Sequence, residues 1–138
     1  MTEPLFTLYL SLGSNLGDRE QMLHRATQLI GERIGTVQRV SSFIETEPWG
    51  FQSEHPFLNA ACKVLTTLTP QQCLKETQRI ERELGRTQKS KDGVYHDRPI
   101  DIDLLLYGDL ELSTPTLTLP HPRMYERDFV MIPLREIM

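Results

Sequence analysis

The sequence has few cysteines, no long apolar run and no excess of positive charge, and each absence excludes a class of protein. Two cysteines, Cys62 and Cys73, are too few for a disulfide framework. No apolar stretch reaches the length of a membrane span, and the first residues have neither a basic stretch nor a cleavable apolar run. The net charge of −4 argues against a general nucleic-acid binder. We therefore expect a cytoplasmic protein with buried free thiols, without membrane or nucleic-acid partners.

Several common catalytic motifs are also absent. No Cys/His cluster has zinc-ligand spacing, and no Gly-x-Ser-x-Gly motif occurs. The segment Gly13-Ser14-Asn15-Leu16-Gly17 lacks the Gly-Lys-Ser/Thr ending of a P-loop and is not Gly-x-Gly-x-x-Gly. A tight turn between a strand and a helix is therefore the better interpretation of this segment than a phosphate loop.

What the sequence does contain is typical of one globular domain spanning residues 1–138. A hydrophobic fraction of 38% and a charged fraction of 25% are ordinary for a soluble protein of this length. Alternating and helical apolar patterns predict the order strand, helix, strand, strand, helix, strand at 6–12, 18–34, 36–45, 57–67, 70–84 and 100–106. This order is that of a ferredoxin-like α+β sandwich, βαββαβ, with an extra C-terminal region of strand and short helix. We expect the helices to cover one sheet face and leave the other free for a ligand.

Two aspartates separated by one residue stand out in the last of these strands. Asp101 and Asp103 point to the same face, because side chains alternate along a strand. Two neighbouring carboxylates repel one another unless something positive lies between them, and a hard divalent cation such as Mg²⁺ suits carboxylate oxygens. A solvent-facing edge strand, or two aspartates each paired with an arginine, would explain the pattern equally well.

A locally basic segment precedes the aspartates. Residues 86–98 have a formal charge of +2, whereas the whole chain has −4. A cationic segment beside an acidic metal site is what a polyphosphate substrate needs, because arginines neutralise charge that develops during phosphoryl transfer. A solvated surface loop is the simpler alternative.

Aromatic and amide side chains occur together upstream. Trp49, Phe57 and Asn59 would suit a flat heterocycle, by stacking on its ring and by hydrogen bonds to its edge. The same residues could also be ordinary strand and loop residues. Among the four histidines, His121 is the best ligand candidate because two prolines flank it.

These segments, in this order, resemble the hydroxymethyl-dihydropterin pyrophosphokinases of folate biosynthesis. The resemblance covers nearly the whole chain and is most specific in Arg98-Pro99-Ile100-Asp101-Ile102-Asp103 and Pro120-His121-Pro122-Arg123-Met124. It implies a ferredoxin-like fold and a transfer of the β,γ-diphosphate of ATP to the hydroxymethyl group of 6-hydroxymethyl-7,8-dihydropterin, which leaves AMP.

The resemblance also implies roles for individual residues. Two Mg²⁺ ions would be held by Asp101 and Asp103. The pterin would be bound by Thr46, Trp49, Phe57, Asn59 and Phe129. ATP would be bound by Gln78, Glu81, Arg86, Lys89, Arg98, Leu104, His121 and Arg127. The catalytic groups would be Arg86, Arg98, Asp101 and Asp103.

One segment departs from the family pattern. Many relatives have Trp-Gly-Pro-Arg before the aspartate strand, whereas this chain has Tyr95-His96-Asp97-Arg98, so Tyr95 is expected to replace the tryptophan. Two other functions stay open at this stage: a non-catalytic ligand-sensing module and a nucleic-acid-binding module of the same fold. The partners that we expect are two small molecules, ATP and the dihydropterin, bound by a monomer.

Overall fold

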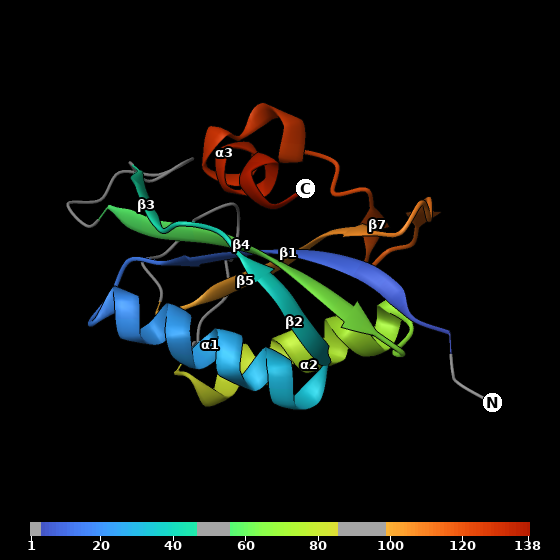
Figure 1. Ribbon diagram of the computed structural model, residues 1–138, viewed down its shortest axis with the longest axis horizontal. Helices are drawn as coiled ribbons and strands as arrows, with labels where there is room; N and C mark the ends of the chain where they lie inside the picture. The colour runs from blue at the N-terminus through green and yellow to red at the C-terminus, as the bar shows by residue number, and fades with distance from the viewer. Residues whose placement is uncertain (1–3, 47–55, 86–98) are drawn as a thin grey trace.

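The computed structural model describes residues 4–46, 56–85 and 99–138. Its centre is an antiparallel sheet in the order β2-β4-β1-β5, with a short strand β3 paired to β4 (Figure 1). The strands are β1 (Phe6–Ser14), β2 (Gly35–Val40), β3 (Ile44–Thr46), β4 (Phe57–Thr66) and β5 (Asp101–Tyr107). The order of strands and helices along the chain and the strand order in the sheet confirm the ferredoxin-like α+β fold.

The first two helices lie on one face of the sheet, and each begins at a capping side chain. In α1 (Arg19–Arg33), Asp18 Oδ1 accepts a hydrogen bond from the backbone N–H of Gln21 at 3.0 Å. In α2 (Pro70–Glu83), Thr69 and Gln72 form a reciprocal capping box, and Pro70 occupies the first helical position. Such caps satisfy backbone N–H groups that a helix leaves unpaired at its start. Both helices therefore begin where the sequence predicts.

The predicted strand 36–45 is wrong as a single element. The structure divides it into β2 and β3, separated by residues 41–43. Ser41 causes the interruption. Its backbone N–H donates to the carbonyl of Ala61, and its side-chain Oγ accepts from the N–H of Ala61. A side chain thus replaces a backbone partner in the ladder, which the apolar pattern of the segment could not reveal.

The main core lies between the sheet and the pair α1 and α2. Along β4, Leu58, Ala60, Cys62 and Val64 contribute to this core, as their alternation predicts. Both Cys62 and Cys73 are buried free thiols, which confirms the prediction for them. Burial raises the pKa of the Cys62 thiol to about 12 and that of Cys73 to about 11.

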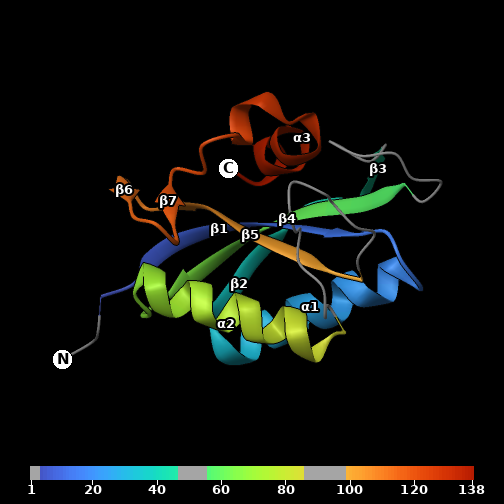
Figure 2. The same ribbon diagram turned by 180° about the vertical axis from the view of Figure 1, so that it is seen from behind.

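The opposite face of the sheet is only partly free, which corrects the expectation of an open face. Helix α3 (Asp128–Ile137) covers part of it, on the side of the sheet away from α1 and α2 (Figures 1 and 2). Its apolar side chains form a second core with Ala61 of β4 and Leu105 of β5. Glu136 fastens the end of this helix, because its Oε1 accepts from the N–H and the hydroxyl of Ser42 at 2.9 and 2.8 Å.

The remaining elements follow the edge strand β5. A hairpin of β6 (Leu112–Ser113) and β7 (Thr118–Leu119) leads to a 3₁₀ turn, η1 (Met124–Glu126), and then to α3. The expected C-terminal region of strand and short helix thus consists of two short strands, a 3₁₀ turn and α3. Within the described ranges, no helix is long and apolar enough to cross a membrane.

Candidate active site

The two aspartates of β5 lie on the sheet face that α3 only partly covers. Both are half-buried, whereas Ile102 and Leu104 between and after them are buried against the helices. This alternation confirms that the two carboxylates share one face. In the register of the sheet, Asp101 lies opposite Gly13 and Asp103 opposite Ser11 of β1. The carboxylates therefore lie along the half of the β1–β5 pair where β5 begins.

A buried carboxylate from α2 holds this strand from its outer edge. Glu81 is 6% exposed, and its Oε2 accepts a hydrogen bond of 2.8 Å from the backbone N–H of Ile102. Because β5 is an edge strand, this N–H has no strand partner on that side, and Glu81 satisfies it. Ile102 stands between the two aspartates, so Glu81 fixes the backbone that presents both. Gln78, half-buried, lies one turn earlier on the same helix.

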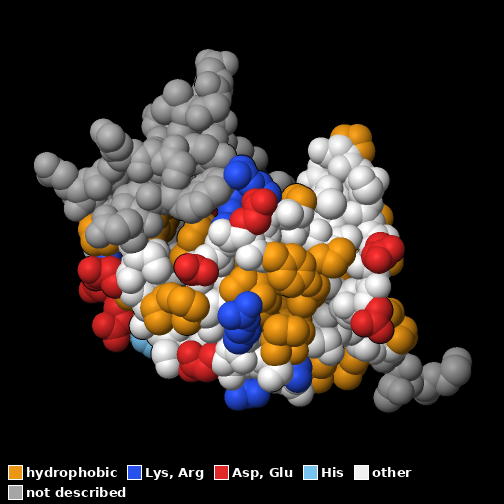
Figure 3. Space-filling model, turned by 90° about the horizontal axis from the view of Figure 1, so that it is seen from above, with side chains coloured by type: hydrophobic (Ala, Val, Ile, Leu, Met, Phe, Trp, Pro, Cys, Tyr) orange, Lys and Arg blue, Asp and Glu red, His pale blue; other side chains and the backbone are white. Residues whose placement is uncertain are grey.

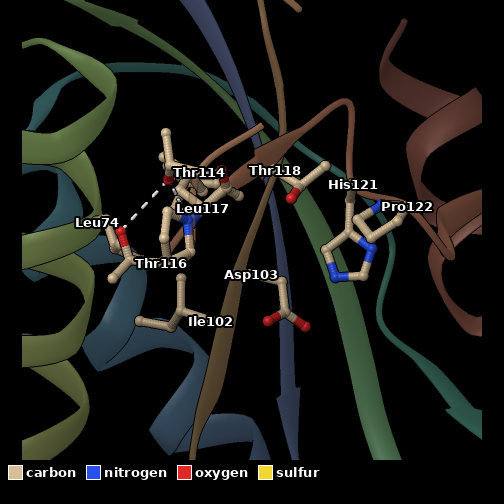
Figure 4. Close-up of a pocket in the computed structure, with 11 residues that line it drawn as sticks. Leu74, Ile102, Asp103, Thr114, Thr116, Leu117, Thr118, His121 and Pro122 are labelled. Atoms are coloured by element: carbon tan, nitrogen blue, oxygen red, sulfur yellow. Dashed lines mark hydrogen bonds between the residues drawn. The ribbon is translucent and has the colours of Figure 1, made fainter. Parts of the chain in front are cut away.

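A pocket of about 270 Å³ opens along the same edge. It is lined by Asp103 and Leu104 of β5, Leu74 of α2, the hairpin residues 114–118, and His121 (Figure 4). In Figure 4 the carboxylate of Asp103 and the imidazole of His121 point in the same direction beside the strand. The pocket thus joins an apolar and hydroxyl-rich part to an acidic and imidazole-bearing part.

His121 is held by the bulged end of β5. The backbone N–H of His121 donates to the carbonyl of Leu105 at 2.9 Å, at the point where the β1–β5 register shifts. Its Nδ1 accepts from the N–H of Arg123 at 3.2 Å, so the neutral tautomer assigned from this bond has its proton on Nε2. Burial lowers the pKa of His121, Arg127 and Arg123 lower it further, and Asp101 opposes them. The neutral ring is therefore favoured, with an N–H donor at Nε2.

A second group of side chains lies on the other side of β1. Asn59 of β4 is 3% exposed, and its Nδ2 donates to Thr46 Oγ1 of β3 at 2.5 Å. Phe57, half-buried, pairs with Thr46 across the two strands, so all three side chains share one face. An aromatic ring beside an amide and a hydroxyl is suitable for stacking and hydrogen bonding to a flat polar ring.

Gly13 connects the two groups, although its sequence context does not predict it as a site residue. In the sheet it lies opposite Asn59 on one side and opposite Asp101 on the other. A Cβ at this position would come within 3.1 Å of Asn59 Oδ1 and 3.4 Å of the Phe57 ring. Glycine therefore leaves room for the Phe57 and Asn59 side chains. Only the strand register reveals this role, because nothing in the local pattern distinguishes Gly13 from a turn glycine.

The start of α3 contributes two more candidates. The guanidinium of Arg127 lies over the ring of Phe129, 5.6 Å from its centroid, within the range of a cation–π contact. Phe129, which belongs to α3, also packs against the second core between this helix and the sheet. Figure 3 shows this face of the molecule, on which hydrophobic side chains gather.

The other predicted site residues lie outside the described ranges. They are Trp49, Arg86, Lys89 and Arg98, together with Tyr95 of the variant segment. Among the described residues, no group of three His, Cys, Asp or Glu side chains is placed to hold a metal ion. The two aspartates alone remain as candidate ligands there.

The fold is a ferredoxin-like α+β sandwich, and its acidic pair and edge pocket provide carboxylate ligands beside a concave surface. The family model of 7,8-dihydro-6-hydroxymethylpterin-pyrophosphokinase (HPPK) matches residues 9–138. The chain is 56% identical over 131 residues to the 2-amino-4-hydroxy-6-hydroxymethyldihydropteridine pyrophosphokinase of Porphyromonas gingivalis, covering 94% of this chain and 89% of that one. The enzyme of the same name in Bacillus subtilis is 46% identical, with 94% and 76% covered.

Solved structures agree with the fold. A crystal structure of HPPK-DHPS in complex with substrates superposes with a TM-score of 0.75 at 15% identity, covering 97% of this chain and 40% of that one. The wild-type HPPK-DHPS of Plasmodium falciparum gives a TM-score of 0.73 at 13% identity, covering 96% and 41%. This chain thus spans about two fifths of those longer proteins. From the family match and the curated relatives, the chain belongs to the HPPK family.

Proposed function

We propose that this protein transfers the diphosphate group of ATP to the hydroxymethyl group of 6-hydroxymethyl-7,8-dihydropterin, giving the pterin diphosphate and AMP in folate biosynthesis. The main support from the structure is one row of residues across three strands. Asn59, Gly13 and Asp101 are direct neighbours in this row. With strands about 4.8 Å apart, the backbone positions of Asn59 and Asp101 are about 10 Å apart across the sheet. A pterin held at Asn59 would thus extend toward phosphates held at Asp101.

The pterin site is assigned to the β3–β4 side of this row. Phe57 and Phe129 would enclose the ring, and Asn59 and Thr46 would bind its polar edge. The hydrogen bond between Asn59 and Thr46 fixes the amide orientation before a ligand arrives. Such preorganisation reduces the entropy cost of binding a rigid heterocycle. Trp49 would complete the site, as the family resemblance implies.

The nucleotide site is assigned to the edge pocket. Its apolar part, beside Leu74 and the backbone of Leu104, suits a base. Its polar part, at Asp103 and His121, faces the row that leads to the pterin side chains. The neutral His121 would donate from Nε2 to a phosphate oxygen, and Arg127 would add positive charge. Gln78 and Glu81 would lie along the α2 wall, with Arg86, Lys89 and Arg98 as further phosphate ligands.

The aspartate pair fits magnesium by its donor set. Mg²⁺ is bound by one or two carboxylates and keeps its other positions for water and substrate phosphates, so two half-exposed carboxylates on one face meet this requirement. We propose that Asp101 and Asp103 hold two Mg²⁺ ions together with ATP. Bound Mg²⁺ would neutralise negative charge on the phosphate oxygens of ATP. The aspartates, fixed through Ile102 and Glu81, determine where that charge lies.

The chemical step that this arrangement favours is a direct, in-line attack of the pterin hydroxyl on the β-phosphorus of ATP. The hydroxyl oxygen bonds to the β-phosphorus and its proton is released, as the bond from the β-phosphorus to the oxygen that bridges to the α-phosphorus breaks and AMP leaves with that oxygen. The contribution of the protein is orientation and charge neutralisation, and the family resemblance assigns Arg86 and Arg98 to the second of these. The described residues of the pterin side hold the hydroxymethyl group toward Asp101.

The direct test is to mix the protein with MgATP and the hydroxymethyl-dihydropterin and to identify the nucleotide product. AMP in a one-to-one ratio with pterin diphosphate is expected. ADP alone, or no product, would refute the proposed reaction. A mixture without the pterin is the control, and it should give no AMP.

The aspartate assignment is tested by Asp101→Ala and Asp103→Ala. Each is expected to lower kcat by roughly 10²–10⁴, because the phosphate charge is no longer fixed in place. Asp109→Ala, an exposed aspartate in the turn after β5, is the matched control and should keep wild-type kcat. Wild-type turnover in either site variant would remove that residue from the proposed metal site.

A single domain, a monomeric state and a cytoplasmic location stay predictions of the sequence.

A further inference from the structure

Arg19, the first residue of α1, connects both strands of the proposed pterin site from below. Its Nη2 donates to Glu45 Oε2 and its Nη1 to the carbonyl of Pro56, each at 2.9 Å. Glu45 directly precedes Thr46, and Pro56 directly precedes Phe57. One guanidinium therefore holds the two backbone segments that present two of the proposed pterin ligands.

The position of Arg19 separates it from the ligand itself. Glu45 lies opposite Leu58, which packs into the core on the α1 and α2 side of the sheet. Side chains alternate along β3, so Thr46 points to the opposite face. Arg19 thus acts on the underside of the strand pair and does not line the site.

The strand pair needs such a support more than the rest of the sheet does. Strand β3 has three residues, and among the described residues it pairs only with β4, through the pairs Ile44–Asn59, Glu45–Leu58 and Thr46–Phe57. The last rung is the one that has two proposed pterin ligands, and it is at the end of the ladder, where strands fray first. Arg19 joins the two chains beside this rung through a planar fork that reaches two acceptors at once.

We propose that Arg19 is a positioning residue for pterin recognition, which fixes the separation of Thr46 and Phe57 through Glu45 and Pro56. This inference rests on the proposed function, because it assigns those two residues to the pterin. An exposed ion pair alone adds little to global stability. The effect of Arg19 is therefore expected on pterin affinity, whereas ATP affinity and overall stability should change little.

The experiment compares wild type with Arg19→Gln and Arg19→Lys. Binding of 6-hydroxymethyl-7,8-dihydropterin is measured with Mg²⁺ and the non-reacting analogue α,β-methylene-ATP present, and analogue binding is measured separately. Arg19→Gln is expected to weaken pterin binding and raise its KM roughly tenfold, since displacements of about 1 Å have effects up to about 10²-fold. Arg19→Lys should be intermediate, because an ammonium keeps the charge but not the two-pronged geometry.

The matched control is Arg33→Gln. Arg33 is the last residue of the same helix and forms an ion pair with Glu83 of α2. The Arg33→Gln variant therefore also loses an ion pair of α1, but at the helix end far from β3. Its pterin affinity should equal that of wild type. Hydrogen exchange at the amides of Thr46 and Phe57 adds a readout without ligand: it should accelerate in Arg19→Gln and not in Arg33→Gln.

Each other outcome overturns the inference. Unchanged pterin binding in Arg19→Gln removes Arg19 from the site. Equal losses of pterin and nucleotide binding, or a large fall in thermal stability in Arg19→Lys as well, show a general structural role. A wild-type protein that forms no AMP refutes the proposed function itself, whereas an active wild type with wild-type-like Arg19 variants refutes only this inference.

Discussion

Removing the Glu81 carboxylate should damage both the stability of the protein and the placement of its aspartates. In Glu81→Ala, the buried N–H of Ile102 on the outer edge of β5 loses the hydrogen bond that Glu81 accepts from it. A buried donor without a partner costs about 1–3 kcal/mol. With an unfolding entropy of about 0.3 kcal/mol/K for a chain of this length, we expect Tm to fall by about 3–10 °C.

The assay combines thermal unfolding with hydrogen exchange at the Ile102 amide. Exchange at Ile102 should accelerate in Glu81→Ala and less so in Glu81→Gln, since an amide oxygen still accepts the bond. Glu83→Ala, an exposed carboxylate on the same helix, is the matched control and should change stability by less than about 0.5 kcal/mol.

We also expect a lower kcat in Glu81→Ala, because Glu81 holds the backbone of Ile102, which lies between the two aspartates. A Glu81→Ala protein with wild-type Tm and a protected Ile102 amide would refute the assignment of Glu81 as the support of β5. Lower kcat with those two properties unchanged would instead place Glu81 in direct contact with the nucleotide.

The glycine of β1, the histidine of the edge pocket and the two buried thiols can each be tested separately. Gly13→Ala should raise the KM for the pterin roughly tenfold, with a smaller effect on ATP, because its Cβ displaces Asn59; equal pterin kinetics would contradict this. In ligand-free protein, NMR should give His121 a pKa below 6.5, because burial disfavours the charged ring. The contribution of the neutral His121 to stability is then complete above about pH 6.5 and is lost as the pH falls. A measured pKa of His121 at or above 6.5 would contradict the burial argument. Cys62 and Cys73, with pKa values of about 12 and about 11, should resist a thiol reagent at pH 8 until the protein unfolds; rapid labelling of the folded protein would contradict this.

Local patterns were sufficient for most of the fold. Both caps, Asp18 and Thr69, and the alternation along β4 and β5 involve neighbours in the sequence, so they can be read without the structure. The division of 36–45 into two strands could not be predicted this way, because it depends on Ser41 bonding to Ala61, twenty residues away. The covering of the second sheet face by α3 also depends on distant partners, among them Glu136 with Ser42.

The candidate site shows the same division. The aspartate pair, Phe57 with Asn59, and His121 were predicted from residue type and spacing, and their roles stay predictions. Gly13 and Arg19 were not, since their importance appears only when β1, β3, β4 and β5 are in register.

The sequence by itself thus determined most of the elements, their order and the side chains capable of binding phosphate, metal and a flat ring, because these depend on chemical type and short-range periodicity. Only the tertiary structure decided how they meet. Glu81 reaches Ile102 across 21 residues and Arg19 reaches Pro56 across 37. Such contacts arise from the packing of helices against the sheet, which no local pattern encodes.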